Sequence, residues 1–122
     1  MMQKKIPFEF VLDYLLPLEI TVKPMFGFYS IYVGKKIILV LRQQKTHPEV
    51  NGVWIATQKE YHKSLKKELP SLCSVSIYTK GLSETEWQML PADANDFETS
   101  VIKVCKLIVH GDPRIGRLPK PH

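Results

Sequence analysis

The sequence predicts an α+β domain in two layers, in which three helices cover an antiparallel sheet of about five strands. Two runs of β-branched and aromatic residues, 28–33 and 37–41, flank the pair Gly34-Lys35. This pattern indicates a β-hairpin, because glycine readily adopts the positive φ of a tight turn. Apolar residues recur at helical spacing in three other stretches of the chain, and short strand-like runs lie between them.

The first two helices are predicted from their ends and their apolar spacing. Pro7 can serve as the first helical residue, and apolar residues follow at i, i+3, i+4 and i+7 over the range 7–17. Thr57 and Glu60 have the spacing of a capping box, in which each side chain bonds the other residue's amide. Pro70 then ends this second helix.

The third helix has the clearest amphipathic pattern in the chain. Asn95 and Glu98 form a cap signature at its start, and His110-Gly111 stops it. Its apolar stripe falls at i, i+4, i+7, i+8 and i+11. The stripe consists of Phe97, Val101, Val104, Cys105 and Ile108.

Four further strands complete the predicted sheet. The first, 21–25, contains Pro24, which cannot donate to a ladder, so the strand lies at a sheet edge or breaks at a bulge. The other three are 53–56, 75–79 and 87–90, and the last of these could instead be a short capped turn.

The hairpin is apolar on both faces. Pairing outward from the turn places Val33 opposite Lys36, Ile31 opposite Ile38 and Tyr29 opposite Val40. A hairpin of this kind is expected to be covered on both sides, by helices, another subunit or a partner. Alternate hairpin residues therefore form a candidate interface, taken from Phe28, Tyr29, Ile31, Tyr32, Val33, Ile38 and Val40.

Length and charge indicate one domain with a basic end. The 122 residues suit a single domain, predicted over 1–110. Residues 111–122 are rich in proline and basic residues, so they form a tail that either docks along the surface or stays mobile. The net charge of +5 is compatible with an anionic partner without requiring one.

The cellular compartment is predicted from the N-terminus, the length of the apolar runs and the cysteines. The N-terminus has no apolar signal core, and no run approaches the roughly 18 apolar residues of a membrane span. Cys73 and Cys105 are far apart in apolar surroundings, which favours two buried thiols of a reduced compartment over a disulfide. A cytoplasmic protein without membrane contact is expected.

The order of elements, together with the segment KPMFGFYSIYVGKK after the first helix, resembles the N-terminal domain of the TfoX competence-regulator family and the related YjbR-like proteins. Met25-Phe26-Gly27, Tyr29, Tyr32 and Gly34 take the places of the family's motif, and Trp87 that of the YjbR-like tryptophan strand. The resemblance covers roughly residues 8–109. It implies a two-layer fold of the secretion-chaperone type, no known catalytic residues and a regulatory or interaction role. YjbR-like proteins are sometimes described as DNA-binding.

No catalytic, metal or cofactor site is expected. The four histidines share no ligand spacing with each other or with the cysteines. Cys105 lies on the apolar stripe of the third helix, where a neutral buried thiol is expected. Asp93, Asp96 and Glu98 lie where the helix dipole alone favours carboxylates.

Lysines gather on one face of the second helix, opposite its apolar positions Tyr61, Leu65 and Leu69. This face could bind phosphates or nucleic acid together with basic residues of the tail. The plainer interpretation is a solvated helix face, and it is the favoured one. The candidate anion-binding residues are Lys59, Lys63, Lys66, Lys67, Arg114, Arg117 and Lys120.

Three functional hypotheses follow. The leading one is a non-enzymatic regulatory or interaction module that acts through a protein partner or through itself as a homodimer. The second is a weak nucleic-acid-binding protein that uses the lysine face and the tail. The third is a small hydrolase or transferase whose site is assembled from scattered residues.

Overall fold

The computed structural model describes residues 6–25, 27–75 and 87–118, and shows the predicted α+β architecture. Within the described residues its sheet has six strands, all antiparallel, in the order β1-β2-β3-β4-β6-β5. The strands are β1 (Ile20–Met25), β2 (Phe28–Val33), β3 (Lys36–Arg42), β4 (Gly52–Ile55), β5 (Cys73–Ser74) and β6 (Gln88–Pro91). The helices are α1 (Phe10–Tyr14), α2 (His62–Glu68) and α3 (Phe97–Val109), with 3₁₀ turns η1 (Pro48–Val50) and η2 (Lys59–Tyr61).

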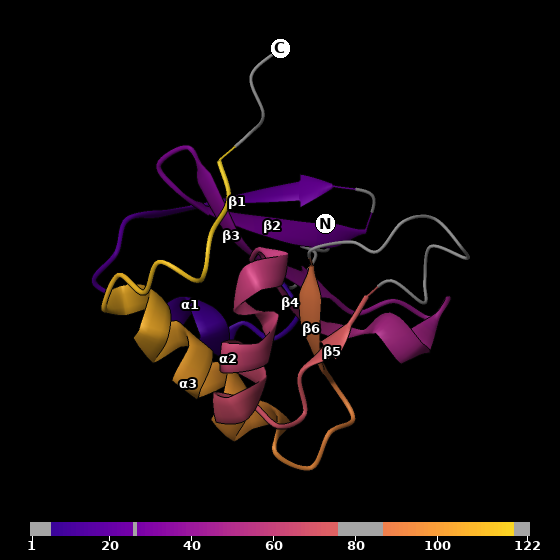
Figure 1. The fold of residues 1–122 in the computed structure, drawn as a ribbon. Coiled ribbons are helices and arrows are strands. Elements are labelled where there is room, and N and C mark those ends of the chain that lie inside the picture. The colour runs from indigo at the N-terminus through magenta and orange to yellow at the C-terminus, as the bar shows by residue number, and fades with distance from the viewer. Residues whose placement is uncertain (1–5, 26, 76–86, 119–122) are drawn as a thin grey trace, which may run out of the picture.

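The helices gather on one side of the sheet (Figure 1). The larger core lies between them and the sheet, because strand residues such as Leu39, Val53 and Leu90 share one buried cluster with Val11 of α1 and Val104 of α3. The α3 stripe predicted from the sequence is buried as expected, apart from half-buried Phe97. We call this side of the sheet the helix face.

The predicted pairing of the hairpin is correct for the two pairs next to the turn, Val33 with Lys36 and Tyr32 with Ile37, and wrong from Ile31 onward. Gly34 has φ +59°, and Val33 pairs with Lys36 as predicted. A β-bulge then shifts the register, so that Ile31 pairs with Leu39 rather than Ile38. With both strand faces apolar, hydrophobic alternation could not reveal this slip. The shift places Val40 and Arg42 on the side away from the helices.

The side away from the helices carries a smaller core, which loop 43–51 helps to form. Val50 of this loop clusters with Met89 and Val75, and the indole Nε1 of Trp54 donates to the Val50 carbonyl at 2.9 Å. Phe28 stacks on Trp54 with ring centroids 6.2 Å apart. The chain therefore supplies part of the cover for this face itself. We call this side of the sheet the loop face.

Two predicted helix starts are wrong. The helix α1 begins at Phe10, not Pro7, because Phe8 has a left-handed φ of +56° that interrupts the turn. The Thr57 side chain does not cap the second helix. It is fully buried and its Oγ donates to the Arg114 carbonyl at 2.6 Å.

The strands predicted at 21–25, 53–56 and 87–90 are present, each shifted by one residue at most. The strand β1 is an edge strand, as Pro24 requires, and β6 matches the predicted strand 87–90. The strand predicted at 75–79 begins earlier than expected: the paired residues are Cys73–Ser74, Val75 follows the strand, and residues 76–79 lie outside the described part of the chain. At the start of α3, Asp96 and not Asn95 is the N-cap residue.

Candidate functional site

The C-terminal segment, defined as residues 111–118, is docked on the sheet. Its residue Arg117 exchanges two backbone hydrogen bonds with Ile37, at 2.9 and 3.0 Å. The Gly116 amide donates to the Ala56 carbonyl at 2.7 Å, and Ile115 is buried in the main core. The sequence left two alternatives for the tail, docked along the surface or mobile. Residues 111–118 are docked, and residues 119–122 lie outside the described part of the chain.

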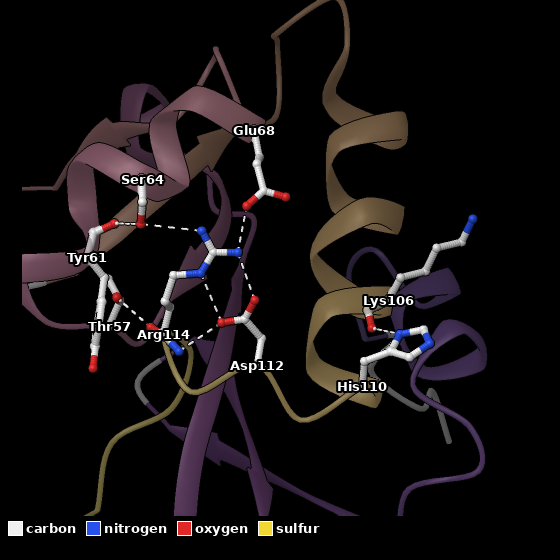
Figure 2. Close-up of polar contacts among 8 residues, drawn as sticks. All are labelled: Thr57, Tyr61, Ser64, Glu68, Lys106, His110, Asp112 and Arg114. Carbon is white, nitrogen blue, oxygen red and sulfur yellow. Dashed lines mark hydrogen bonds and ion pairs between the residues drawn. The ribbon is translucent and has the colours of Figure 1, made fainter.

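An ion-pair cluster fastens the C-terminal segment to α2. The Arg114 guanidinium donates to Asp112 through Nε (2.9 Å) and a terminal nitrogen (2.7 Å). That terminal nitrogen also contacts Glu68 at 2.6 Å, and the other one contacts the Ser64 hydroxyl at 3.3 Å. Figure 2 shows Arg114 reaching from the segment toward α2, between these partners. We call these four residues the Arg114 cluster.

The electrostatics of the Arg114 cluster favour its charged state. The hydrogen bonds from Arg114 lower the pKa of the Asp112 carboxyl below its usual value. The same bonds raise the pKa of the Arg114 guanidinium. Nearby, the ring of His110, the C-cap residue of α3, contacts the Lys106 carbonyl at 2.7 Å (Figure 2). Arg114 is therefore paired with carboxylates of the same chain, and the cluster stabilises the contact between the C-terminal segment and α2.

A cavity of about 200 Å³ lies beside this fastening. Its wall is mainly apolar and comes from the loop after α1, the facing ends of β2 and β3, the end of α3 and the C-terminal segment. The wall includes Leu18, Val33, Lys36, Ile38, Asp112 and Ile115. Figure 1 shows these chain segments meeting at one end of the molecule.

Two of the exposed apolar side chains, Leu16 and Leu118, belong to segments that contribute to the cavity wall. Among the described residues, the exposed large hydrophobic ones are Tyr14 (44%), Leu16 (65%), Met25 (41%) and Leu118 (68%). Tyr14 ends α1, Leu16 lies two residues before Leu18, and Leu118 ends the C-terminal segment. We call the cavity together with Tyr14, Leu16 and Leu118 the apolar end.

The predicted anion-binding residues do not form one surface. Lys59, Lys63, Lys66 and Lys67 are all exposed on η2 and α2 at helical spacing, and Lys66 also donates to the Leu72 carbonyl at 2.8 Å. Arg114 is engaged in its cluster and half-buried Arg117 lies in the pairing with β3. Lys120 lies outside the described residues.

The predicted interface residues of the hairpin are largely used inside the chain. Ile31, Ile38 and Val40 are at most 3% exposed, so the chain itself already covers them. The remaining four are half-buried: Phe28, Tyr29, Tyr32 and Val33. Val33 and Ile38 contribute to the cavity wall. The hairpin therefore contributes to the apolar end only through its turn-proximal residues.

The two thiols are protonated at neutral pH. Burial raises the pKa of Cys105 to about 12, and its Sγ lies 3.9 Å from the Val11 carbonyl. Burial also raises the pKa of Cys73. Within the described ranges, no three His, Cys, Asp or Glu side chains come together in a metal-binding group.

Sequence reasoning missed the apolar end and one buried cation. Leu16 and Leu118 each precede a proline outside any periodic run, a signal that could have marked them as loop residues with exposed apolar side chains. Arg42 is 3% exposed and donates to the Thr46 and His47 carbonyls at 3.0 Å and to Asn51 Oδ1 at 2.7 Å. These hydrogen bonds hold loop 43–51 together. In the sequence Arg42 only follows an apolar run, so no local pattern indicated this role.

No protein-family model, curated protein or solved structure matches the chain. None of the helices in the described residues has the length and apolar character needed to cross a membrane.

Proposed function

We propose that this protein is a non-enzymatic interaction module that binds another protein through its apolar end. The observation that carries this proposal is the exposure of Leu16 and Leu118 on two segments, the loop after α1 and the C-terminal segment, that also contribute residues to the wall of an apolar cavity. Exposed apolar surface beside an apolar cavity is typical of interaction sites. The resemblance to TfoX N-terminal domains, which are regarded as regulatory or interaction modules, leads to the same expectation.

The proposal restricts the hairpin's part in the interaction surface to its residues near the turn. Burial of Ile31, Ile38 and Val40 within the chain leaves little of the predicted hairpin face for a second copy to cover. A partner at the apolar end would instead bury Leu16 and Leu118 around the cavity. A homodimer through this end is the alternative occupant, and oligomeric state separates it from a different partner.

The test compares affinity capture by the wild-type chain and by two variants, from a nuclease-treated lysate of the native cell. The double variant Leu16→Ser/Leu118→Ser should lose a retained protein, whereas Lys63→Gln/Lys67→Gln should keep it. Light scattering on the purified wild type reports self-association. The proposal fails if every retained protein is retained equally by the Leu16→Ser/Leu118→Ser chain and the molecule stays a monomer at all concentrations.

A second candidate function is nucleic-acid binding by the lysine face. The observation that favours it is the exposure of Lys59, Lys63, Lys66 and Lys67 on one short helical stretch. Four neutralised phosphates predict a log–log salt slope of about −3 to −4 for mixed-sequence DNA. Replacing all four lysines by Gln should flatten that slope, and absence of binding at about 50 mM salt would remove this candidate.

A further inference from the structure

The dipeptide Asn51-Gly52 joins loop 43–51 to the first residue of β4. In a flexible chain such a dipeptide is prone to deamidation, because glycine has no side chain to hold its nitrogen away from the preceding asparagine. The Gly52 nitrogen bonds to Asn51 Cγ, the Cγ–Nδ2 bond breaks, and ammonia leaves with the proton of the attacking nitrogen. Water then opens the cyclic imide to aspartate or, as the main product, to isoaspartate.

The fold requires both residues of this dipeptide. Gly52 has φ +149°, and a Cβ built on it would overlap the Leu90 carbonyl oxygen, so another residue would displace β6. The Asn51 Oδ1 accepts from Arg42 at 2.7 Å and from the Gln44 amide at 2.9 Å. Its Nδ2 donates to the Gln44 carbonyl at 2.8 Å, a bond that a carboxylate could not make. The loop therefore depends on a pair of residues that is chemically reactive.

The closed loop holds this pair in an unreactive geometry. Formation of the imide requires the Gly52 nitrogen to eclipse Asn51 Cβ about the Cα–C bond. Asn51 has an extended ψ of +138°, which turns that nitrogen away from Cβ. The Ala92 amide donates to the Asn51 carbonyl at 2.9 Å and fixes this peptide plane. Because the hydrogen bonds of the side chain also fix Cγ, the reaction requires loop 43–51 to open first.

We propose that Asn51 is a site of spontaneous deamidation that becomes reactive when loop 43–51 opens, and that its isoaspartyl product keeps the loop from closing again. Isoaspartate adds a methylene to the main chain directly before Gly52, the residue of β4 that pairs with Arg42 and Pro91. It also replaces the amide that bonds the Gln44 carbonyl. The site shares no residue with the cavity wall, so it is independent of the proposed function.

The test is a peptide map by mass spectrometry of the full chain, aged at mildly alkaline pH in native buffer and in guanidinium chloride. Deamidation of Asn51 should be at least about a hundredfold slower in native buffer, because several hydrogen bonds must break before the reaction. The variant Arg42→Met removes a charged donor from the loop and should accelerate deamidation of Asn51 in native buffer about tenfold. The chain's other asparagine, exposed Asn95, is the internal reference and should be unaffected by that variant.

Equal rates at Asn51 in native buffer and in denaturant overturn the proposal, as does an unchanged rate in folded Arg42→Met. The comparison of the two buffers uses the wild type alone, so it does not depend on the folding of the variant.

The effect of the modification on the loop is measured by amide hydrogen exchange. Chain aged in denaturant is returned to native buffer, and fresh chain taken through the same steps is the control. Loop 43–51 of the isoaspartyl form should exchange at least about tenfold faster than in the control, whereas α3 should be unchanged. Unchanged exchange in the loop, or equal loss of protection in α3, overturns the proposed effect on the loop.

Discussion

The two faces of the sheet are covered by different means. On the helix face, apolar side chains from all three helices pack on the strands in one continuous cluster. On the loop face, a small cluster around Val50, Val75 and Met89 is joined to a polar network centred on Arg42. The helix face is therefore stabilised mainly by burial of apolar area, and the loop face depends also on hydrogen bonds that must all be made together.

The largest expected effect comes from neighbouring residues of β6 that point to opposite faces. Leu90 belongs to the helix-face cluster and Met89 to the loop-face cluster, and both are at most 2% exposed. Leu90→Ala should cost about 3–5 kcal/mol of unfolding free energy, and Met89→Ala about 2–3 kcal/mol, because the smaller cluster can collapse more readily around the lost volume. Urea unfolding of the two variants measures the difference. Equal losses would show that the two clusters contribute alike.

The next effect tests the polar network of the loop face. Arg42→Met should cost about 2–4 kcal/mol, because the Thr46 and His47 carbonyls and the Asn51 side chain lose a buried charged donor. Amide hydrogen exchange should accelerate in loop 43–51 and leave α3 unchanged. The control Arg42→Lys keeps the charge and lacks the forked donors, so it should recover only part of the loss. Full recovery with lysine would show that charge alone holds the loop.

These comparisons explain which features could be predicted from the sequence. Pro24 lacks an amide N–H, so an edge position for β1 was one of the two outcomes predicted, and the α3 stripe was predictable from its spacing. The strand register from Ile31 onward was not predictable, because the two faces of the hairpin are equally apolar. The role of Thr57 was also hidden, because its partner Arg114 lies 57 residues away in the chain.

The candidate site was less predictable than the fold for the same reason. Its cavity is assembled from five separate segments of the chain, and the local patterns of these segments predict secondary structure but not that they meet. The lysine face was visible because one helical stretch contains it. Arg114 was predicted as a basic residue that could bind an anion. Its ion pairs with Asp112 and Glu68 were not predicted, because the fold brings these residues together.

A smaller effect is expected from acid at the Arg114 cluster. The pKa of Asp112 is lowered in the folded chain, so its contribution is present above the ordinary pKa of an aspartate and is lost as pH falls through the depressed folded value. Asp112→Asn should lower stability at pH 7 by on the order of 1 kcal/mol, discounted for solvent screening. The variant should also lose part of the acid dependence of unfolding. Parallel pH profiles for wild type and Asp112→Asn would show that another carboxylate carries the dependence.

The smallest effect on stability is expected at the apolar end. Leu16 is 65% exposed and Leu118 is 68% exposed, so replacing each by Ser removes little buried area and should change the unfolding free energy by less than about 0.5 kcal/mol. A matched change at buried Leu15, Leu15→Ser, should be strongly destabilising, because this neighbour of Leu16 is fully buried in the core. Urea unfolding of the three variants checks both expectations. If Leu16→Ser proved as costly as Leu15→Ser, Leu16 would be a core residue of this chain rather than a group available to a partner.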